Sequence, residues 1–422
     1  MKRLALTFAL LGIALTPTLA DEWSQWRGAN RDGVAVDAKL PAILPAKLPE
    51  PLWKAYVGEG YSSPVIAKGK VFIMGNEGNK VETCLSFDAN TGKQLWRKPH
   101  DCAFEPPDAR AGKGPNSTPT VDRDRVYMLG LGGHFSCIEI KSGNILWTRD
   151  LNSEFWGVER GADGEDKWFP VCGASASPLV DGNNVILPVG GKKAGCIVAF
   201  DRRTGKIVWK ALEERSSYAS PLFANLAGQR QLVGFTGLRM VGLDDSEHKL
   251  LWEHPLAAFM EQTIVSPVIW KDNVLIGCDA KPIVCLNLSK EDDKIKTKVA
   301  WQNADLSAYM VTPIAVKDHL FGMDQRSGRL VCVDLTTGKT KWTSTKLIGG
   351  LGYVSLVVAS NRIFALTTSG ELNVFEVNTE KCVPLVTWKP AGEGFNWAHL
   401  TITGSRLYVK DKTNLYCYEL GK

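Results

Sequence analysis

The stretch Asp88-Ala89-Asn90-Thr91-Gly92-Lys93-Gln94-Leu95-Trp96 decides the fold, because its pattern, Asp-x-x-Thr-Gly-Lys-x-x-Trp, recurs along the chain. Glycine after threonine allows the positive φ of a tight turn, and the aspartate can accept hydrogen bonds from the backbone of that turn. The tryptophan offers a large flat surface for packing against a neighbouring repeat. Clear copies run from Asp201 to Trp209 and from Asp334 to Trp342, and weaker copies end at Trp147, Trp252, Trp301 and Trp388.

Each ending closes a longer repeat of apolar strands and turns. The repeat opens at Ser63-Pro64, Thr118-Pro119, Ser177-Pro178, Ser220-Pro221, Ser266-Pro267 and Thr312-Pro313, and it ends at Trp53, Trp96, Trp147, Trp209, Trp252, Trp301, Trp342 and Trp388. The spacing of these tryptophans, from 41 residues (Trp301 to Trp342) to 62 (Trp147 to Trp209), brackets one four-stranded propeller blade. We therefore predict an all-β fold, an eight-bladed β-propeller of four-stranded antiparallel blades.

The ring must also be closed. The last segment, residues 397–420, has three apolar strands and lacks the terminal tryptophan, whereas residues 51–57 supply a lone strand with Trp53. We predict that the N-terminal strand joins the C-terminal blade, which removes an open sheet edge.

The Asp-x-x-Thr-Gly-Lys-x-x-Trp ending resembles the tryptophan-docking motif of quinoprotein dehydrogenases and of the PQQ-like repeat family, which includes BamB-like proteins. The resemblance covers about residues 51–422. The opening Trp23-Ser24-Gln25-Trp26-Arg27-Gly28-Ala29-Asn30-Arg31-Asp32-Gly33 is similar to the start of many exported bacterial PQQ-repeat proteins.

The N-terminal region predicts export. Residues 1–20 read as a signal peptide, with Lys2 and Arg3 before a short apolar run and a small-residue cleavage site at Ala20. Residues 21–50 are expected to form an extended arm along the propeller at 51–422. Asp21, and not a cysteine, comes directly after the cleavage site, so we expect no lipid anchor at that position. No later stretch is apolar enough to span a membrane, so we expect a periplasmic or secreted protein.

The ten cysteines divide into three groups by position. Six occupy the same third-strand slot and are expected to be small buried apolar residues: Cys84, Cys137, Cys196, Cys285, Cys332 and Cys417. Cys278 and Cys382 have no obvious mates. Cys102 and Cys172 lie in two long connections between blades, and we predict a disulfide between them that contributes about 4 kcal/mol; the alternative is two free loop thiols.

The two long connections are also the candidate binding surface, because propellers bind through loops on one face. The candidates there are Glu105, Arg110, Lys113, Trp156, Glu159, Arg160 and Trp168. Exposed aromatic residues beside arginines favour contact with a partner. The alternative is that these loops fold over the propeller and bury Trp156 and Trp168.

Loops between second and third strands add His134, Arg239 and Arg326, whose charges would favour an acidic ligand if they converge on the channel. Metal-binding His and Cys spacings and calcium loops are absent, so we expect no metal. The net charge of +5 comes without a basic run, which argues against nucleic acid.

Two hypotheses for function remain. The first is a non-catalytic scaffold, expected to be monomeric and without cofactor, that binds a protein or cell-envelope component. The second is a quinoprotein-like dehydrogenase, or a sugar-binding or small-molecule-binding propeller, with a degenerate channel site that takes PQQ with calcium. The second is disfavoured because the dehydrogenases of the resembled family carry an adjacent cysteine pair, and no two cysteines are adjacent here.

Overall fold

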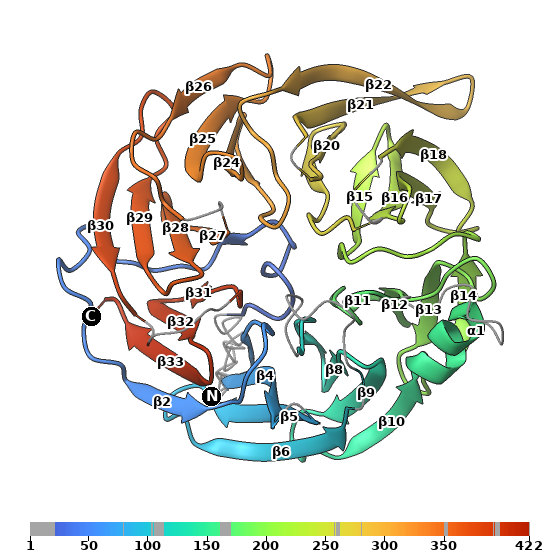
Figure 1. The fold of residues 1–422 in the computed structure, drawn as a ribbon, viewed down its shortest axis with the longest axis horizontal. Coiled ribbons are helices and arrows are strands. Elements are labelled where there is room, and N and C mark those ends of the chain that lie inside the picture. The colour runs from blue at the N-terminus through green and yellow to red at the C-terminus, as the bar shows by residue number, and fades with distance from the viewer. Residues whose placement is uncertain are drawn as a thin grey trace, which may run out of the picture.

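The computed structural model describes residues 22–78, 80–102, 104, 114–160, 170–256, 258, 262–279, 281–349, 353–390, 392 and 397–421, without the side chains of residues 159 and 160. The predicted signal peptide lies outside these residues. The strands form eight antiparallel sheets of four strands in a ring, and one sheet carries an extra short parallel strand, β1 (Val34–Ala35) (Figure 1). The predicted eight-bladed β-propeller is therefore confirmed.

The blades are numbered here in the order of their inner strands, and each runs from the channel outward. Blades 1 to 4 consist of β3 (Val65–Ala67), β4 (Lys70–Glu77), β5 (Val81–Asp88) and β6 (Gln94–Asp101); β7 (Thr120–Asp122), β8 (Arg125–Leu129), β9 (His134–Glu139) and β10 (Ile145–Asp150); β11 (Leu179–Asp181), β12 (Asn184–Pro188), β13 (Ile197–Asp201) and β14 (Ile207–Ala211); and β15 (Leu222–Leu226), β16 (Gln229–Phe235), β17 (Arg239–Asp244) and β18 (Leu250–Pro255). Blades 5 to 8 consist of β19 (Val268–Trp270), β20 (Asn273–Ile276), β21 (Ile283–Glu291) and β22 (Lys294–Asn303); β23 (Ile314–Val316), β24 (His319–Asp324), β25 (Arg329–Asp334) and β26 (Thr340–Thr343); β27 (Val354–Ala359), β28 (Arg362–Thr367), β29 (Leu372–Glu376) and β30 (Pro384–Trp388); and β31 (Thr401–Thr403), β32 (Arg406–Lys410), β33 (Asn414–Glu419) and β2 (Trp53–Tyr56).

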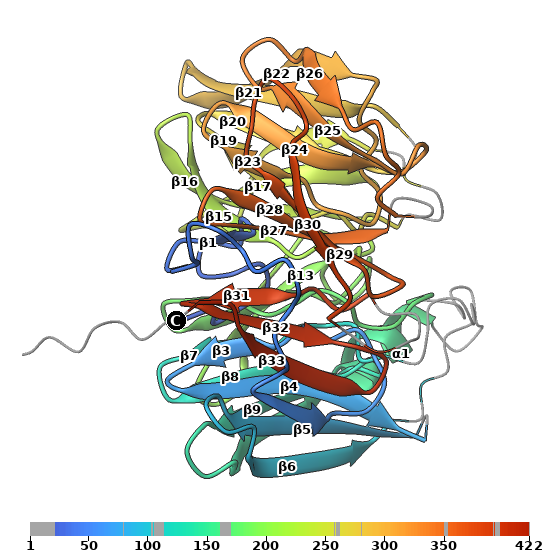
Figure 2. The ribbon, with the colours of Figure 1, turned by 90° about the vertical axis from the view of Figure 1, so that its left-hand side faces the viewer.

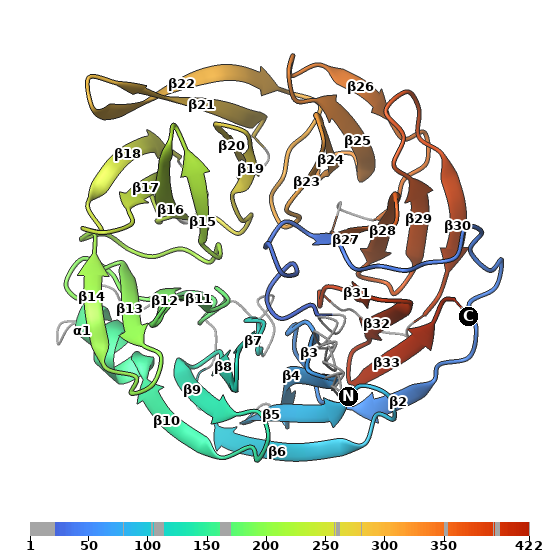
Figure 3. The same cartoon turned by 180° about the vertical axis from the view of Figure 1, so that it is seen from behind.

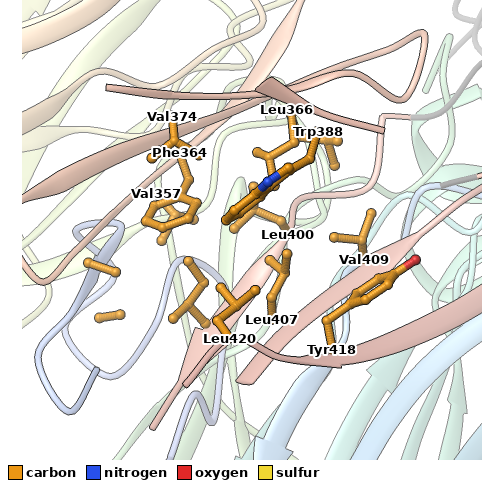
Figure 4. Packing of buried hydrophobic residues seen from close by; sticks show 14 of the residues in the cluster. Val357, Phe364, Leu366, Val374, Trp388, Leu400, Leu407, Val409, Tyr418 and Leu420 are labelled. Atoms are coloured by element: carbon orange, nitrogen blue, oxygen red, sulfur yellow. The ribbon is translucent and has the colours of Figure 1, made fainter. Parts of the chain in front are cut away.

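The core lies between the blades. Eight apolar clusters each join two neighbouring blades, so every blade buries both of its faces. In the cluster between blades 7 and 8, Phe364 and Trp388 face Leu400 and Val409 (Figure 4). The six cysteines of the third-strand slot are buried within this packing.

The recurring tryptophans lie at the outer edge of these interfaces. In the first blade, Asp88 Oδ1 accepts hydrogen bonds from the Thr91 backbone N–H and hydroxyl, both at 2.9 Å, and Gly92 takes a φ of 68°. The indole N–H of Trp53 donates to Ala89 O at 3.1 Å. Four more tryptophans donate to a carbonyl of the next blade's turn: Trp96 to Ile140 (3.2 Å), Trp147 to Arg202 (3.2 Å), Trp301 to Leu335 (2.9 Å) and Trp342 to Asn378 (2.9 Å).

Two blades depart from this arrangement. His248 replaces the turn glycine of blade 4, at a φ of 58°, and its ring stacks on Trp209 with centroids 4.1 Å apart. Blade 5 extends its outer hairpin, β21–β22, to a turn at Asp292–Asp293, so Trp252 instead donates to Gln231 Oε1 of its own blade at 2.5 Å.

The N-terminal strand closes the ring as predicted. β2 pairs antiparallel with β33, and Trp53 lies opposite Cys417 in the register of that pair. Because the fourth strand of blade 8 is β2, which comes from the N-terminal part of the chain, no turn joins the third and fourth strands of this blade to receive Trp388. The indole N–H of Trp388 donates to Pro45 O of the arm instead, at 3.1 Å.

The rest of the arm takes a route that the sequence did not predict. Residues 23–35 lie in the central channel and end in β1, which pairs with β27. Residues 36–50 then cross blades 7 and 8 on the face that carries the Asp-Thr-Gly turns and reach β2 at the rim (Figure 3). The short helix α1 (Gly157–Arg160) lies on the opposite face (Figure 2). One face is therefore partly covered by the arm, and the other carries the connections between blades.

The docking of tryptophan on the turn glycine gives a testable prediction. A Cβ on Gly92 would lie 2.6 Å from the Trp53 ring, so Gly92→Ala should lower the free energy of unfolding by about 2 to 3 kcal/mol. Gly69 is the matched control, because its φ of 70° is similar but a Cβ there would meet nothing within 4 Å. Gly69→Ala should cost only about 1 kcal/mol. Chemical denaturation of both variants measures the difference; equal losses would show that the indole does not rest on the glycine.

Candidate functional site

The face that carries the connections between blades is the candidate site. After β10, the second long connection begins with η2 (Asn152–Trp156), a short π-helical segment, and continues into α1. Phe155 and Trp156 are buried between blades 2 and 3, and the Trp156 indole N–H donates to Val189 O at 2.9 Å. Trp156 is thus a structural anchor, and it is not exposed to a partner as the contact hypothesis expected.

A charged pair fixes the same segment. Arg149 Nε donates to Glu154 Oε1 at 2.7 Å, and Arg149 Nη1 donates to Gly205 O of blade 3 at 2.7 Å. The side-chain hydrogen bond to Glu154 raises the pKa of Arg149. The aromatic pair and this ion pair together hold the start of the connection, and they leave Val158 of α1 45% exposed.

A small cavity lies beneath this connection. Its walls include Leu129, Trp156, Val189, Ser217 and Tyr218, and its interior of about 20 Å³ has room for a single water-sized molecule. The Tyr218 hydroxyl accepts a hydrogen bond from the Cys172 backbone N–H at 3.2 Å. The cavity is too small for a sugar or a quinone.

A buried polar group lies at the base of the first connection. Glu82 of β5 is fully buried; its Oε1 accepts a hydrogen bond from the Leu131 N–H at 2.9 Å, and its Oε2 lies 3.3 Å from His100 Nε2. The His100 ring stacks on that of His134 with centroids 4.1 Å apart. A Cβ on Gly130 would lie 2.2 Å from Glu82 Oε2, so glycine at that position lets the carboxylate of blade 1 reach blade 2.

The electrostatics of this group favour a structural role. Burial and the neighbouring His100 lower the pKa of His134 to about 4, so its ring is neutral at neutral pH. Burial and the Glu82 carboxylate raise the pKa of Cys102 to about 11, which keeps its thiol protonated. A protonated thiol is a poor nucleophile, so Cys102 is not suited to covalent catalysis.

The predicted disulfide between Cys102 and Cys172 is absent from the structure. Both cysteines are described, and no disulfide joins them. Cys102 lies beside Glu82 and next to Gly132 of blade 2. The Cys172 carbonyl accepts a hydrogen bond from Asn116 Nδ2 at 3.4 Å, and its backbone N–H donates to the Tyr218 hydroxyl. Because the adjacent Gly173 packs on Leu131, both connections approach the same loop of blade 2 without a bond between the two sulfur atoms.

The remaining described candidates do not gather at the channel. His134, Arg239 and Arg326 lie on blades 2, 4 and 6, at alternate positions around the ring. Arg239 is paired with Glu214 at 2.8 Å and with Glu253, and Arg326 is paired with Asp324 at 2.9 Å. Each arginine is already neutralised by a nearby carboxylate. Glu105, Arg110, Lys113, Trp168 and the side chains of Glu159 and Arg160 lie outside the described residues.

The channel does not fit a quinone with calcium. The arm places Trp26, Arg27 and Arg31 where the Ser/Thr-Pro segments line the channel, so a planar cofactor there would have to displace the protein's own side chains. No cysteine is adjacent to another. Within the described ranges, no group of three or more His, Cys, Asp or Glu side chains is arranged to hold a metal ion.

Sequence reasoning missed what the Ser/Thr of each opening does. Its side-chain oxygen accepts a hydrogen bond from the backbone of the neighbouring blade. Examples are Ser63 N–H to Thr118 Oγ1 (3.2 Å), Thr118 N–H to Ser177 Oγ (3.0 Å), Ser177 N–H to Ser220 Oγ (2.9 Å), Ser266 N–H to Thr312 Oγ1 (3.1 Å) and His399 N–H to Ser63 Oγ (2.8 Å). These bonds fasten blade to blade around the channel, and the repeated Ser/Thr-Pro was the signal that pointed to them.

Comparison with known proteins gives one family model, described as outer membrane protein assembly factor BamB, that matches residues 81–344. Among curated proteins, the outer membrane protein assembly factor BamB of Shewanella oneidensis is 21% identical over 383 residues, which cover 71% of this chain and 92% of that protein.

Solved structures show the same fold. The BamB structure from Moraxella catarrhalis superposes with a TM-score of 0.60 and 14% identity, over 88% of this chain and 99% of that one. Quinohemoprotein alcohol dehydrogenase from Comamonas testosteroni superposes with a TM-score of 0.61 and 13% identity, over 96% of this chain and 81% of that one. At these identities the likeness is one of fold. In the described part of the chain, no helix is both long and apolar enough to cross a membrane.

Proposed function

Because the chain belongs to the family described as outer membrane protein assembly factor BamB, we propose that it is an exported, non-catalytic scaffold that binds a protein of the cell envelope. Its binding surface is the face that carries the connections between blades, around α1. The protein works outside the cytoplasm and uses no cofactor for this role.

The observation that carries the proposal is the difference between the two faces (Figure 2). On the face of the Asp-Thr-Gly turns, the arm fills the channel and crosses blades 7 and 8, where Arg362 Nη2 donates to Pro41 O at 2.9 Å. On the opposite face, buried anchors fix the start of the second connection and present α1 outward. A surface held rigidly by its base binds a protein with a smaller loss of conformational entropy.

Site-specific photocrosslinking in cells tests this proposal. A photoreactive amino acid replaces Val158, 45% exposed on α1, or Ile43, 86% exposed on the arm at the other face. We expect a protein adduct from position 158 and none from position 43. Thermal unfolding of both purified variants verifies that neither replacement disturbs the fold. An adduct from position 43 alone, or from neither position, contradicts the proposal.

A further inference from the structure

The segment from Trp23 to Ala35 touches every blade from inside the channel. It bonds through backbone groups to Ile66 of blade 1, Val121 of blade 2 and Val358 of blade 7. Its side chains reach the other five blades, at Pro178 (blade 3), Pro221 (blade 4), Ser266 (blade 5), Pro313 (blade 6) and His399 (blade 8). The segment is thus surrounded on every side, as a ligand is in a binding site.

Two guanidinium groups make most of the side-chain contacts. Arg27 Nη1 donates to Thr312 O at 3.0 Å, and Arg27 Nη2 donates to Pro313 O at 3.0 Å. Arg31 Nη1 donates to Pro221 O at 3.0 Å, and Arg31 Nη2 donates to Pro178 O. The acceptors are thus backbone carbonyls of the Ser/Thr-Pro segments on blades 3, 4 and 6. Proline carbonyls accept hydrogen bonds, but proline has no N–H to form a strand ladder.

The arginines are held there at a cost. Arg27 and Arg31 are 3% and 4% exposed, and burial lowers their pKa values to about 10 and about 9, so both remain cations at neutral pH. Both residues also take left-handed backbone conformations, with φ of 61° and 58°, which disfavour side chains with a Cβ. Residues persist in such conformations when the surrounding contacts over-determine them. The planar fork of arginine matches the spread of carbonyl groups, whereas the point charge of lysine does not.

We propose that these carbonyl groups of blades 3, 4 and 6 form a peptide-binding site for guanidinium side chains, and that residues 23–35 occupy it as a peptide ligand in cis. The ligand class is a short peptide that carries two arginines four residues apart beside a tryptophan. Trp26 completes the fit, because its indole N–H donates to Ser266 Oγ at 3.2 Å and its ring lies 4.4 Å from that of His399. This inference does not depend on the proposed partner.

Cleavage of the folded protein tests the proposal. A site for a specific protease is inserted at the exposed Ile43, and the chain is cut after folding, so that the segment stays only through its non-covalent contacts. A second variant also carries Arg27→Lys and Arg31→Lys, which keep both positive charges but remove both planar guanidinium groups. We expect the native segment to leave the cut protein more than about tenfold more slowly than the double-lysine segment.

A second measurement covers the case in which the lysine chain does not fold. The cut native protein is first freed of its own segment by gel filtration in mild denaturant and returned to native buffer. Fluorescent peptides of residues 21–36, native or with both lysines, are then added, and binding is followed by fluorescence anisotropy. Far-UV circular dichroism verifies that the propeller stays folded. The native peptide should bind more than about tenfold more tightly than the lysine peptide. Equal release rates of the two segments, or equal binding or no binding of the two peptides when the lysine chain does not fold, overturn the proposal.

Discussion

Trp53→Ala should lower the free energy of unfolding by about 4 kcal/mol, because one side chain joins the two ends of the chain. The indole is 8% exposed, lies 6.0 Å from the Tyr408 ring of its own blade, and donates to Ala89 O of blade 1. Its removal leaves a cavity in the apolar cluster between blades 8 and 1. Guanidinium denaturation followed by the remaining tryptophans measures the loss.

The adjacent Leu52 supplies the matched control. Its side chain is 49% exposed on the same segment, so Leu52→Ala should change the free energy of unfolding by less than about 1 kcal/mol. A large loss of unfolding free energy for Trp53→Ala, together with a small one for Leu52→Ala, would show that the contact between blades 8 and 1 holds the ring closed. If the two substitutions cost the same, closure by β2 contributes little to stability.

The architecture could be predicted because the motif that supplies both its turn and its docking tryptophan is short and repeated. Asp88, Thr91, Gly92 and Trp96 fall within nine residues, and each feature has one physical use, in the turn or in docking. The same reasoning identified the unpaired last blade, because a missing tryptophan at one end matched Trp53 at the other. Because the motif is repeated, the clear copies made the weaker ones recognisable.

The route of the arm could not be predicted, although its residues stand out. Arg31 meets Pro178 and Pro221, which are 147 and 190 residues away. The acceptors are backbone carbonyls, which every residue possesses, so no side chain in the sequence marks the receptor. Only the closed ring brings these groups to one axis.

The binding role of the candidate site stays a prediction, but the structure decides between two alternatives for one of its residues. Trp156 was expected either to contact a partner or to be buried by a loop that folds back, and the structure buries it, with its indole N–H bonded to Val189 O. The Cys102–Cys172 pairing assumed that two loops on one face meet at their cysteines. Glu82, fully buried beside Cys102, was not among the candidates, because a lone glutamate in a strand carries no pattern.

Arg31→Met should lower the free energy of unfolding by about 3 kcal/mol, because it removes two charge-assisted hydrogen bonds to buried carbonyl groups, each of which contributes about 1.5 to 3 kcal/mol. Methionine keeps much of the side-chain volume but leaves the Pro221 carbonyl without the donor that it has in the native channel. The substitution also removes the hydrogen bond that Arg31 Nε donates to Gln25 Oε1 at 2.8 Å. Each buried carbonyl left unpaired costs about 1 to 3 kcal/mol. Relief of the cation's burial offsets part of this loss.

The control is Arg362→Met, because Arg362 also donates to arm carbonyls, to Pro41 O at 2.9 Å and to Ala42 O at 2.6 Å, but at the outer face. Water can replace the guanidinium there, so the loss should stay below about 1 kcal/mol. Urea denaturation of the two variants compares one arm contact inside the channel with one outside it. If Arg31→Met and Arg362→Met lowered the free energy of unfolding equally, the arginines of the channel segment would not contribute to the stability of the propeller.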